Sequence, residues 1–244
     1  EVHHEMFVYV LRLLEKAHLL GGKYLGIDAS TMEANAAMKS IVRRDTGESY
    51  QQMLVHLAEA SGIKTPTKAE LVVFDRKRKG KTTSNKDWQS TTDEEARIGK
   101  LKDGRTHMAY KPEHVVDLES GAIVSAVIHP ADQGDRTTIT TTLEDAQAKL
   151  CAVREKEEAP GIDDPFDLVA DKGYHSADSL ELGQHLNYRT YVPEPKRRGD
   201  WDWSERTEDH ERAVMNNRKR MKRQKGKALQ RARSELCERS FAHV

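Results

Sequence analysis

The chain contains two short apolar runs that each end in an aspartate, Lys23-Tyr-Leu-Gly-Ile-Asp28 and Phe166-Asp-Leu-Val-Ala-Asp171. Both runs predict buried strands. In open α/β sheets, sites form at the carboxyl ends of the strands, so acids on adjacent strand ends would converge. Two neighbouring carboxylates are costly unless a cation lies between them. The pattern therefore favours a cation site, although each aspartate alone is also typical of a solvated turn or a helix cap.

The rest of the chain predicts a mixed α/β sheet flanked by helices. Two paired strands are joined by a turn at Glu119-Ser-Gly121, and an amphipathic helix near the start ends at Gly21-Gly22. The expected helices span 5–20, 49–61, 135–148 and 176–185, with one more after the Thr67/Glu70 capping box, and the expected further strands span 107–117, 122–129 and 188–192. Residues 205–241 predict one long helix or two, with Gly226 as the weak point. Residues 76–104 are almost all polar and predict a mobile basic loop whose candidate anchor is Trp88.

Composition excludes some classes of protein. Charged residues make up 33% of the chain, above the usual quarter, so much of it must be solvated surface or polar loop. No apolar run approaches the roughly 18 residues that a membrane span needs, and no signal peptide is visible. Cys151 and Cys237 lie far apart without metal-ligand spacing, which indicates reduced thiols in a cytoplasmic protein.

Charge is strongly segregated although the net charge is zero. From Arg212 to Arg233 there is no acidic residue, and ten basic residues fall in this stretch: Arg212, Arg218, Lys219, Arg220, Lys222, Arg223, Lys225, Lys227, Arg231 and Arg233. Such a run can neutralise the phosphates of double-stranded DNA without reading its sequence, and a solvated helix face is the alternative. Trp201 and Trp203 nearby have the chemistry to stack on bases, or to form the rim of the core.

Three separated motifs resemble bacterial insertion-sequence transposases of the DDE type. Leu25-Gly-Ile-Asp28-Ala-Ser-Thr31 resembles the strand of their first aspartate, Asp171-Lys-Gly-Tyr-His-Ser176 the segment of their second, and Glu238-Arg-Ser-Phe-Ala-His243 their glutamate helix. Linking stretches resemble one branch of the family: Asp75-Arg-Lys-Arg-Lys-Gly80, Ala96-Arg-Ile-Gly-Lys100, Lys102-Asp-Gly-Arg105 and Pro130-Ala-Asp-Gln-Gly-Asp135. The resemblance covers nearly the whole chain.

The resemblance implies a ribonuclease H-like fold and an enzyme that cleaves transposon ends and joins them to target DNA. It implies that Asp28, Asp171 and Glu238 bind Mg²⁺, for which Mn²⁺ substitutes. Lys172 and His175, beside Asp171, are candidate contacts to DNA, as are Arg218, Lys219, Arg220, Lys222 and Arg223. The family implies a homodimer in the bacterial cytoplasm, associated with the nucleoid. We expect residues 1–22 to lead into a catalytic domain at 23–244, with 32–104 as an insertion.

The glutamate motif departs from its usual form, Tyr-x2-Arg-x3-Glu-x6-Lys. Counting back from Glu238, the first two places hold Arg231 and Ser234, and the final lysine falls beyond the last residue. Counting from Glu235 gives the partial match Arg231-x3-Glu235, so Glu235 remains an alternative third acid. We expect the last helix to be incomplete and the DNA-binding helices that recognise transposon ends to be missing. A nuclease that cuts without rejoining, and an inactive remnant that binds DNA, remain open alternatives.

Overall fold

The two apolar runs form neighbouring parallel strands in the computed structural model of the chain, β1 (Tyr24–Ala29) and β8 (Phe166–Val169). The structure describes residues 2–80, 84–101, 103–154, 165–196, 201, 203–204 and 206–242. These residues form two compact units, one built from 1–30, 112–129 and 133–244 and the other from 31–111 and 130–132. Among the described residues, no helix has both the length and the apolar character needed to cross a bilayer.

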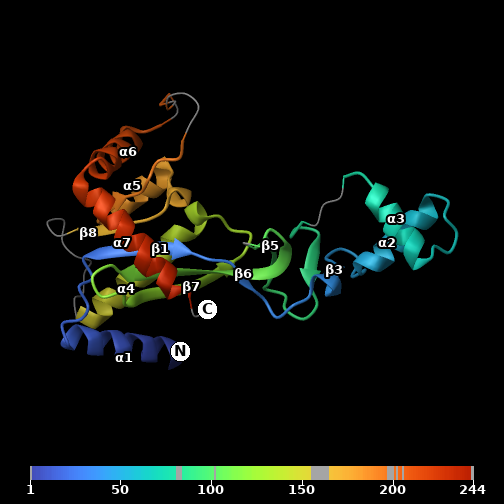
Figure 1. Cartoon of the computed structure of the whole chain (residues 1–244), viewed down its shortest axis with the longest axis horizontal. Coiled ribbons are helices and arrows are strands. Elements are labelled where there is room, and N and C mark those ends of the chain that lie inside the picture. Colours follow the sequence, from blue (N-terminus) through green and yellow to red (C-terminus); the bar gives the residue numbers. More distant parts are fainter. Residues whose placement is uncertain are drawn as a thin grey trace. The chain divides into compact units, whose positions relative to one another are not determined.

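The first unit is a mixed sheet with helices on both faces (Figure 1). Its strands run in the order β7-β6-β1-β8-β9, where β1 is antiparallel to β6 and parallel to β8, and β8 is parallel to β9. Its further elements are α1 (Val2–Lys16), β6 (Thr106–Asp117), β7 (Ile123–Pro130), α4 (Asp135–Arg154), η2 (Lys172–Tyr174), α5 (Ala177–His185), β9 (Tyr188–Tyr191), α6 (Glu208–Met221) and α7 (Gln224–Ser240). This arrangement confirms the predicted α/β class and its ribonuclease H-like sheet.

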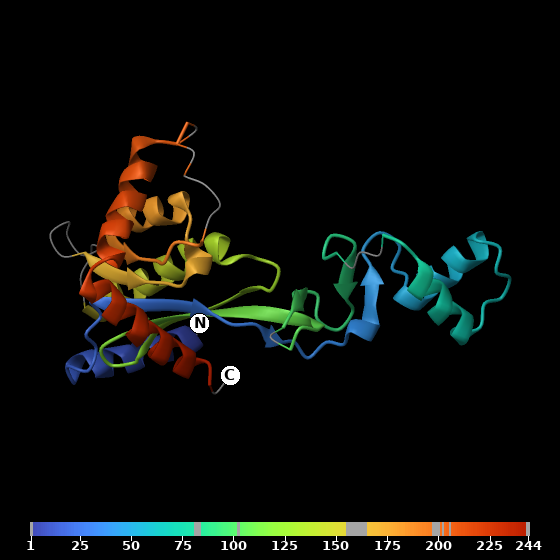
Figure 2. The same ribbon diagram turned by 45° about the horizontal axis from the view of Figure 1, so that its top comes forward.

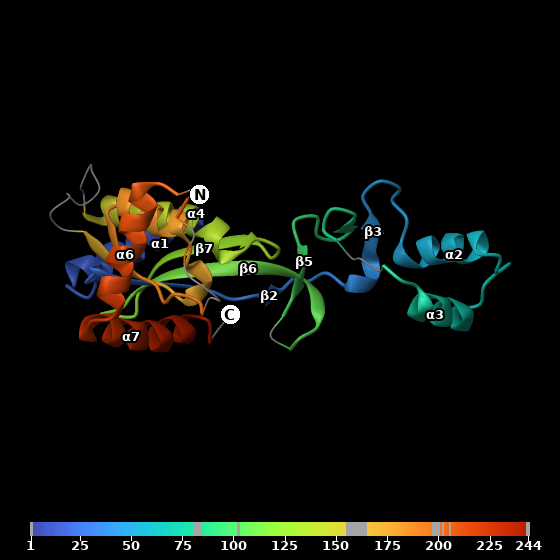
Figure 3. The same cartoon turned by 90° about the horizontal axis from the view of Figure 1, so that it is seen from above.

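Successive side chains along β1 point to opposite faces of the sheet, and different helices cover the two faces. Leu25 and Ile27 are fully buried in a cluster with Leu11 of α1 and Leu143 of α4. Gly26 points the other way: a Cβ there would lie 2.8 Å from the sulfur of Cys237 on α7. Figure 3 shows α7 on one side of the strands and α1 with α4 on the other. Glycine at position 26 therefore lets α7 lie directly on β1.

The second unit contains a two-stranded sheet, a pair of helices and two strands that pair with residues 106–110 of β6. Its elements are β2 (Met32–Glu33), η1 (Met38–Ser40), β3 (Ile41–Arg43), α2 (Tyr50–Ala60), α3 (Lys68–Lys77), β4 (Trp88–Ser90) and β5 (Arg97–Lys100), and residues 106–111 of β6 also belong to it. The capping box of Thr67 and Glu70 is formed as predicted, and Gly62 ends α2 with a φ of 92°.

The prediction of a polar loop over 76–104 was partly wrong. β4 and β5 fall inside this range, and Trp88 is buried as the predicted anchor. The side chain of Asn85 accepts from the backbone N–H of Ile98 at 2.7 Å and donates to its carbonyl at 3.0 Å. The side chain of Asn85 thus bonds the backbone groups of Ile98 that a neighbouring strand would otherwise bond. Hydrophobic patterning does not reveal such a contact.

One helix boundary differs from the predictions, and the C-terminal segment adopts one of the two predicted alternatives. α1 ends at Lys16 rather than near Leu20, because His18 adopts a left-handed φ of 56° and its N–H bonds to Glu15. The C-terminal segment is two helices, and Figure 2 shows the bend between α6 and α7. The break lies before Gly226, which sits in the first turn of α7, where a Cβ would be 2.7 Å from the carbonyl oxygen of Arg220.

Candidate active site

Asp28 lies on β1, and Asp171 follows the end of the neighbouring parallel strand β8 by two residues. The ladder pairs Tyr24 with Asp167 and ends where Gly26 pairs with Val169, and beyond it the charge of Asp171 acts on Asp28. Gly26 contacts α7, and side chains alternate along a strand, so Asp28 also points to the α7 side, where it pairs with Arg233. Asp28 and Asp171 are therefore close enough for their charges to interact, and their role as metal ligands stays a prediction.

The carboxylate of Asp28 is held by two donors. Its Oδ1 accepts the backbone N–H of Ala29 at 2.9 Å, and its Oδ2 accepts Nη1 of Arg233 at 2.9 Å. Burial raises the pKa of Asp28 above its ordinary value, the negative charge of Asp171 raises it further, and Arg233 opposes both effects. The two aspartates thus repel each other, which a bound cation would relieve.

Asp171 is oriented by the turn that follows it. Its Oδ1 accepts the backbone N–H of Gly173 at 2.6 Å, and the aspartate caps η2. A Cβ at Gly173 would lie 2.9 Å from this same oxygen and would collide with the carboxylate of Asp135. Glycine at position 173 therefore leaves room for the carboxylates of both Asp135 and Asp171 beside the turn. Sequence reasoning placed Asp135 only at a helix start, because nothing in its spacing linked it to Asp171.

Tyr174 ties this turn to a buried carboxylate that sequence reasoning missed. Its hydroxyl donates to Oε1 of Glu113 at 2.7 Å. Glu113 is fully buried on β6 and also accepts the hydroxyls of Thr138 and Thr142, with His129 Nε2 at 3.4 Å from its other oxygen. A buried charge needs such a set of donors. Glu113 thus fixes the turn of Asp171 from the opposite face of the sheet.

Glu238 lies on the flank of α7, beside Cys237, which is buried against β1. Burial raises the pKa of the Cys237 thiol to about 12, and the charges of Asp28 and Glu238 contribute to the shift. The carboxylate of Glu238 accepts the hydroxyl of Ser234 at 3.2 Å and is exposed. Glu235 lies further round the helix, 70% exposed, and pairs with Arg239 at 2.8 Å. Both glutamates are exposed, and Glu238 is the one that directly follows the buried Cys237.

The donor chemistry of Asp28 and Asp171 fits a divalent cation. Mg²⁺ prefers oxygen ligands and is commonly held by one or two carboxylates together with phosphate. Among the described residues, however, no three histidine, cysteine or acidic side chains are grouped closely enough to hold a metal ion. The structure therefore brings two of the three predicted acids together and leaves the glutamate outside their group.

The basic run divides into side chains bound by protein acceptors and side chains open to solvent. Arg218 donates to both carboxylate oxygens of Glu194 at 2.7 Å, and Arg220 donates to Thr190. Arg233 and Lys225 pair with Asp28 and Asp167. Lys225 and Arg212 are exposed although they are paired, Arg212 with Asp209, and the further exposed members are Lys219, Lys222, Arg223, Lys227 and Arg231. Lys219, Lys222 and Arg223 are thus the predicted DNA contacts that stand in solvent.

Lys172 and His175, the predicted DNA contacts beside Asp171, also differ in their exposure to solvent. Lys172 is exposed, whereas His175 is fully buried and meets Trp201 edge-on, with ring centroids 5.9 Å apart. Trp201 in turn stacks on Trp203 at 4.9 Å. The ring of His175 therefore packs in the core. A direct contact between His175 and DNA would require Trp201 to move away from it. Trp201, 8% exposed, likewise forms the rim of the core.

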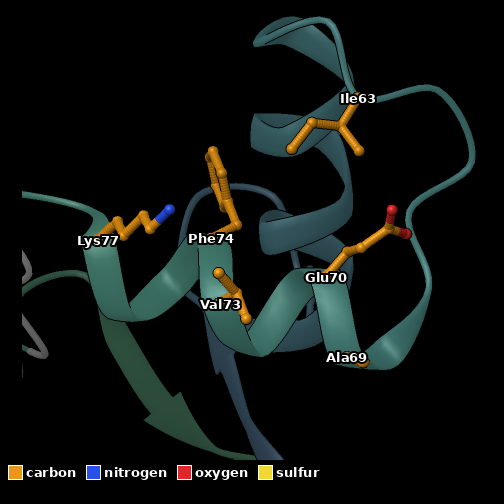
Figure 4. Close-up of a pocket in the computed structure, with 6 residues that line it drawn as sticks. All are labelled: Ile63, Ala69, Glu70, Val73, Phe74 and Lys77. Atoms are coloured by element: carbon orange, nitrogen blue, oxygen red, sulfur yellow. The ribbon is translucent and has the colours of Figure 1, made fainter.

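A separate pocket of about 410 Å³ lies in the second unit and carries different chemistry. It is lined by Ile63, Ala69, Glu70, Val73, Phe74 and Lys77, which Figure 4 shows around α3. Its one carboxylate, Glu70, is already bound to the N–H and hydroxyl of Thr67 in the capping box. The pocket has no pair of acids and offers no site for phosphate chemistry.

Comparison with known proteins identifies the family of the chain. Residues 52–243 match the family model described as "Transposase DDE domain". The match includes Asp171 and Glu238 and begins after Asp28. No curated protein matches. A solved structure titled "Mos1 transposase paired-end complex with left transposon end" shares 9% identity and a TM-score of 0.31, covering 94% of this chain and 61% of that chain, a likeness too weak to assign residues. Because the family model spans well over half of the sequence, the chain belongs to the family of transposase DDE domains.

Proposed function

We propose that the protein is a metal-dependent DNA transposase that cleaves transposon ends and joins them to target DNA. The observation that supports this most is that Asp28 and Asp171 lie at the carboxyl ends of adjacent parallel strands, with Asp28 against the helix that carries Glu238. We further propose a bacterial insertion sequence as its source and a homodimer as its working form, because the linking motifs resemble that branch of the family.

In this proposal Asp28, Asp171 and Glu238 hold two divalent ions, Mg²⁺ or Mn²⁺. When bound there, the ions would activate an oxygen nucleophile and would neutralise charge on the leaving oxygen. A water oxygen bonds to the phosphorus at the transposon end, the bond to the 3′ oxygen breaks, and that oxygen takes a proton. The new 3′-hydroxyl then attacks a phosphodiester of the target, whose own 3′ oxygen leaves.

The protein's own part in these steps is to position groups. Gly173 and Ala29 orient the two aspartates through backbone N–H groups. Lys172, Lys219, Lys222 and Arg223 are exposed and are the residues we propose to hold the phosphate backbones. Glu238 must move toward the aspartates to join them, and the exposure of its side chain leaves it free to do so.

The test is nicking of supercoiled plasmid in Mn²⁺ by the chain and its Asp171→Asn variant. We expect the wild type to nick and Asp171→Asn to lose at least a hundredfold in rate. Asp178→Asn is the matched control, because Asp178 lies seven residues after Asp171, is exposed and is outside the site. Equal nicking by Asp171→Asn and the wild type would remove Asp171 from the mechanism. Joining of a pre-cut oligonucleotide to the plasmid separates a transposase from a nuclease.

A second candidate function is DNA binding without cleavage. It is favoured by one observation, that no three potential ligands are grouped as a metal site in the described part of the chain. Metal-independent DNA binding together with no nicking in Mn²⁺ would support this alternative.

A further inference from the structure

Arg233 of α7 reaches the first aspartate, Asp28. Its Cγ lies 3.2 Å from the place where a Cβ at Gly26 would stand, so its stem packs on β1. Its Nη1 then donates to Oδ2 of Asp28 at 2.9 Å, and the side chain is 11% exposed. Because α7 approaches β1 closely at Gly26, the guanidinium of Arg233 lies against Asp28.

Arg233 has more donor capacity than the protein uses. A guanidinium carries five N–H donors. Its Nε is buried and has no hydrogen-bond partner, whereas both oxygens of Asp28 already accept a donor. A buried donor without a partner is uncommon in native proteins and calls for an explanation, such as a ligand. The planar fork of arginine matches phosphate oxygens in particular.

We propose that Arg233 is a further residue of the site, which pairs with Asp28 until a divalent ion displaces it and then donates to a phosphate oxygen of the DNA. This inference rests on the proposed function, because it takes Asp28 as a metal ligand and DNA as the substrate. The ion and the guanidinium compete for the same carboxylate oxygen, Oδ2 of Asp28.

The exchange makes metal and DNA binding mutually dependent. Metal at Asp28 frees the guanidinium for phosphate, and phosphate on the guanidinium frees Asp28 for metal. Each ligand then raises the affinity of the other by the same factor, as linkage requires. Without DNA the aspartate stays paired and metal binds weakly, which restrains cleavage until substrate is in place.

The test measures Mn²⁺ binding by calorimetry at pH 8 without DNA. Arg233→Met keeps the apolar stem and removes the competitor, so we expect it to bind Mn²⁺ about tenfold more tightly than the wild type, the scale of one hydrogen bond to a charged group. Arg239→Met is the control, since it removes an exposed arginine from an ion pair on the same helix without touching Asp28. It should remain within about twofold of the wild type. Circular dichroism checks that each variant is folded, and Arg233→Lys, expected between the two, replaces Arg233→Met if that variant does not fold.

A second measurement follows a labelled DNA duplex by anisotropy, with Ca²⁺ or with a chelator. The wild type should gain affinity for DNA when the ion is present, and Arg233→Met should lose most of that gain. Mn²⁺ binding by Arg233→Met that is equal to or weaker than that of the wild type would overturn the inference while leaving the transposase proposal standing. If neither protein binds Mn²⁺ and the wild type does not nick DNA, the proposed function itself fails.

Discussion

Tyr174→Phe removes one hydroxyl from the network behind the second aspartate. That hydroxyl donates at 2.7 Å to Glu113, whose side chain is 0% exposed, so the carboxylate would lose a donor that water cannot replace. A hydrogen bond to a charged group contributes about 1.5–3 kcal/mol. For a protein of this size that loss corresponds to a fall in Tm of about 3–12 °C.

The assay is urea denaturation of the wild type, Tyr174→Phe and the control Tyr9→Phe. Tyr9 is 54% exposed on α1, so loss of its hydroxyl should change the free energy of unfolding by less than about 0.5 kcal/mol. We also expect nicking by Tyr174→Phe to fall by a factor of about ten to a hundred, because the turn of Asp171 is displaced when its anchor is lost.

A double-mutant cycle with Glu113→Gln isolates the contact. Coupling of at least about 1 kcal/mol between positions 113 and 174 is expected. Unfolding free energies of Tyr174→Phe and wild type that agree within about 0.5 kcal/mol would refute the account of Glu113 as the anchor of the turn.

Three further predictions follow from the charges and thiols of the first unit. The hydrogen bonds from Arg218 lower the pKa of Glu194 to about 2 from its ordinary 4.5, so wild-type stability should fall as pH drops from about 4.5 to 2, and unfolding of Arg218→Ala should lack this pH dependence. Thiol reagent at pH 8 should modify the half-exposed Cys151 in the native protein and reach the buried Cys237 only after unfolding, whereas rapid reaction of both would contradict the packing on β1. Lys222→Ala should reduce the slope of log DNA affinity against log salt by about 0.9, whereas an unchanged slope would remove Lys222 from the DNA surface.

The sequence predicted the centre of the fold because local patterns encode it. The apolar runs before Asp28 and Asp171, and the turn at Gly121, each form the predicted element. Their convergence followed from the general placement of sites at strand ends.

Contacts between distant residues account for what the sequence did not reveal. Glu113 is a strand residue whose partners come from α4 and η2, so no local spacing marks it as buried. Arg233 is one of ten basic residues in a run predicted to bind DNA, and nothing in the sequence distinguishes it from the others, whereas the structure packs it on Gly26. The left-handed φ of His18 is likewise uncommon for a residue other than glycine, and propensity alone does not anticipate it.

The most direct test of the central claim is a crystal structure of the chain soaked with Mn²⁺, read from the anomalous signal. We expect a Mn²⁺ peak bound by carboxylate oxygens of both Asp28 and Asp171, at ligand distances of about 2.1 Å, with Arg233 moved away from Asp28. Glu238 in the same coordination shell would complete the proposed set of acids. Saturating Mn²⁺ that gives no peak between the two aspartates, with the pair of Arg233 and Asp28 intact, would contradict the account.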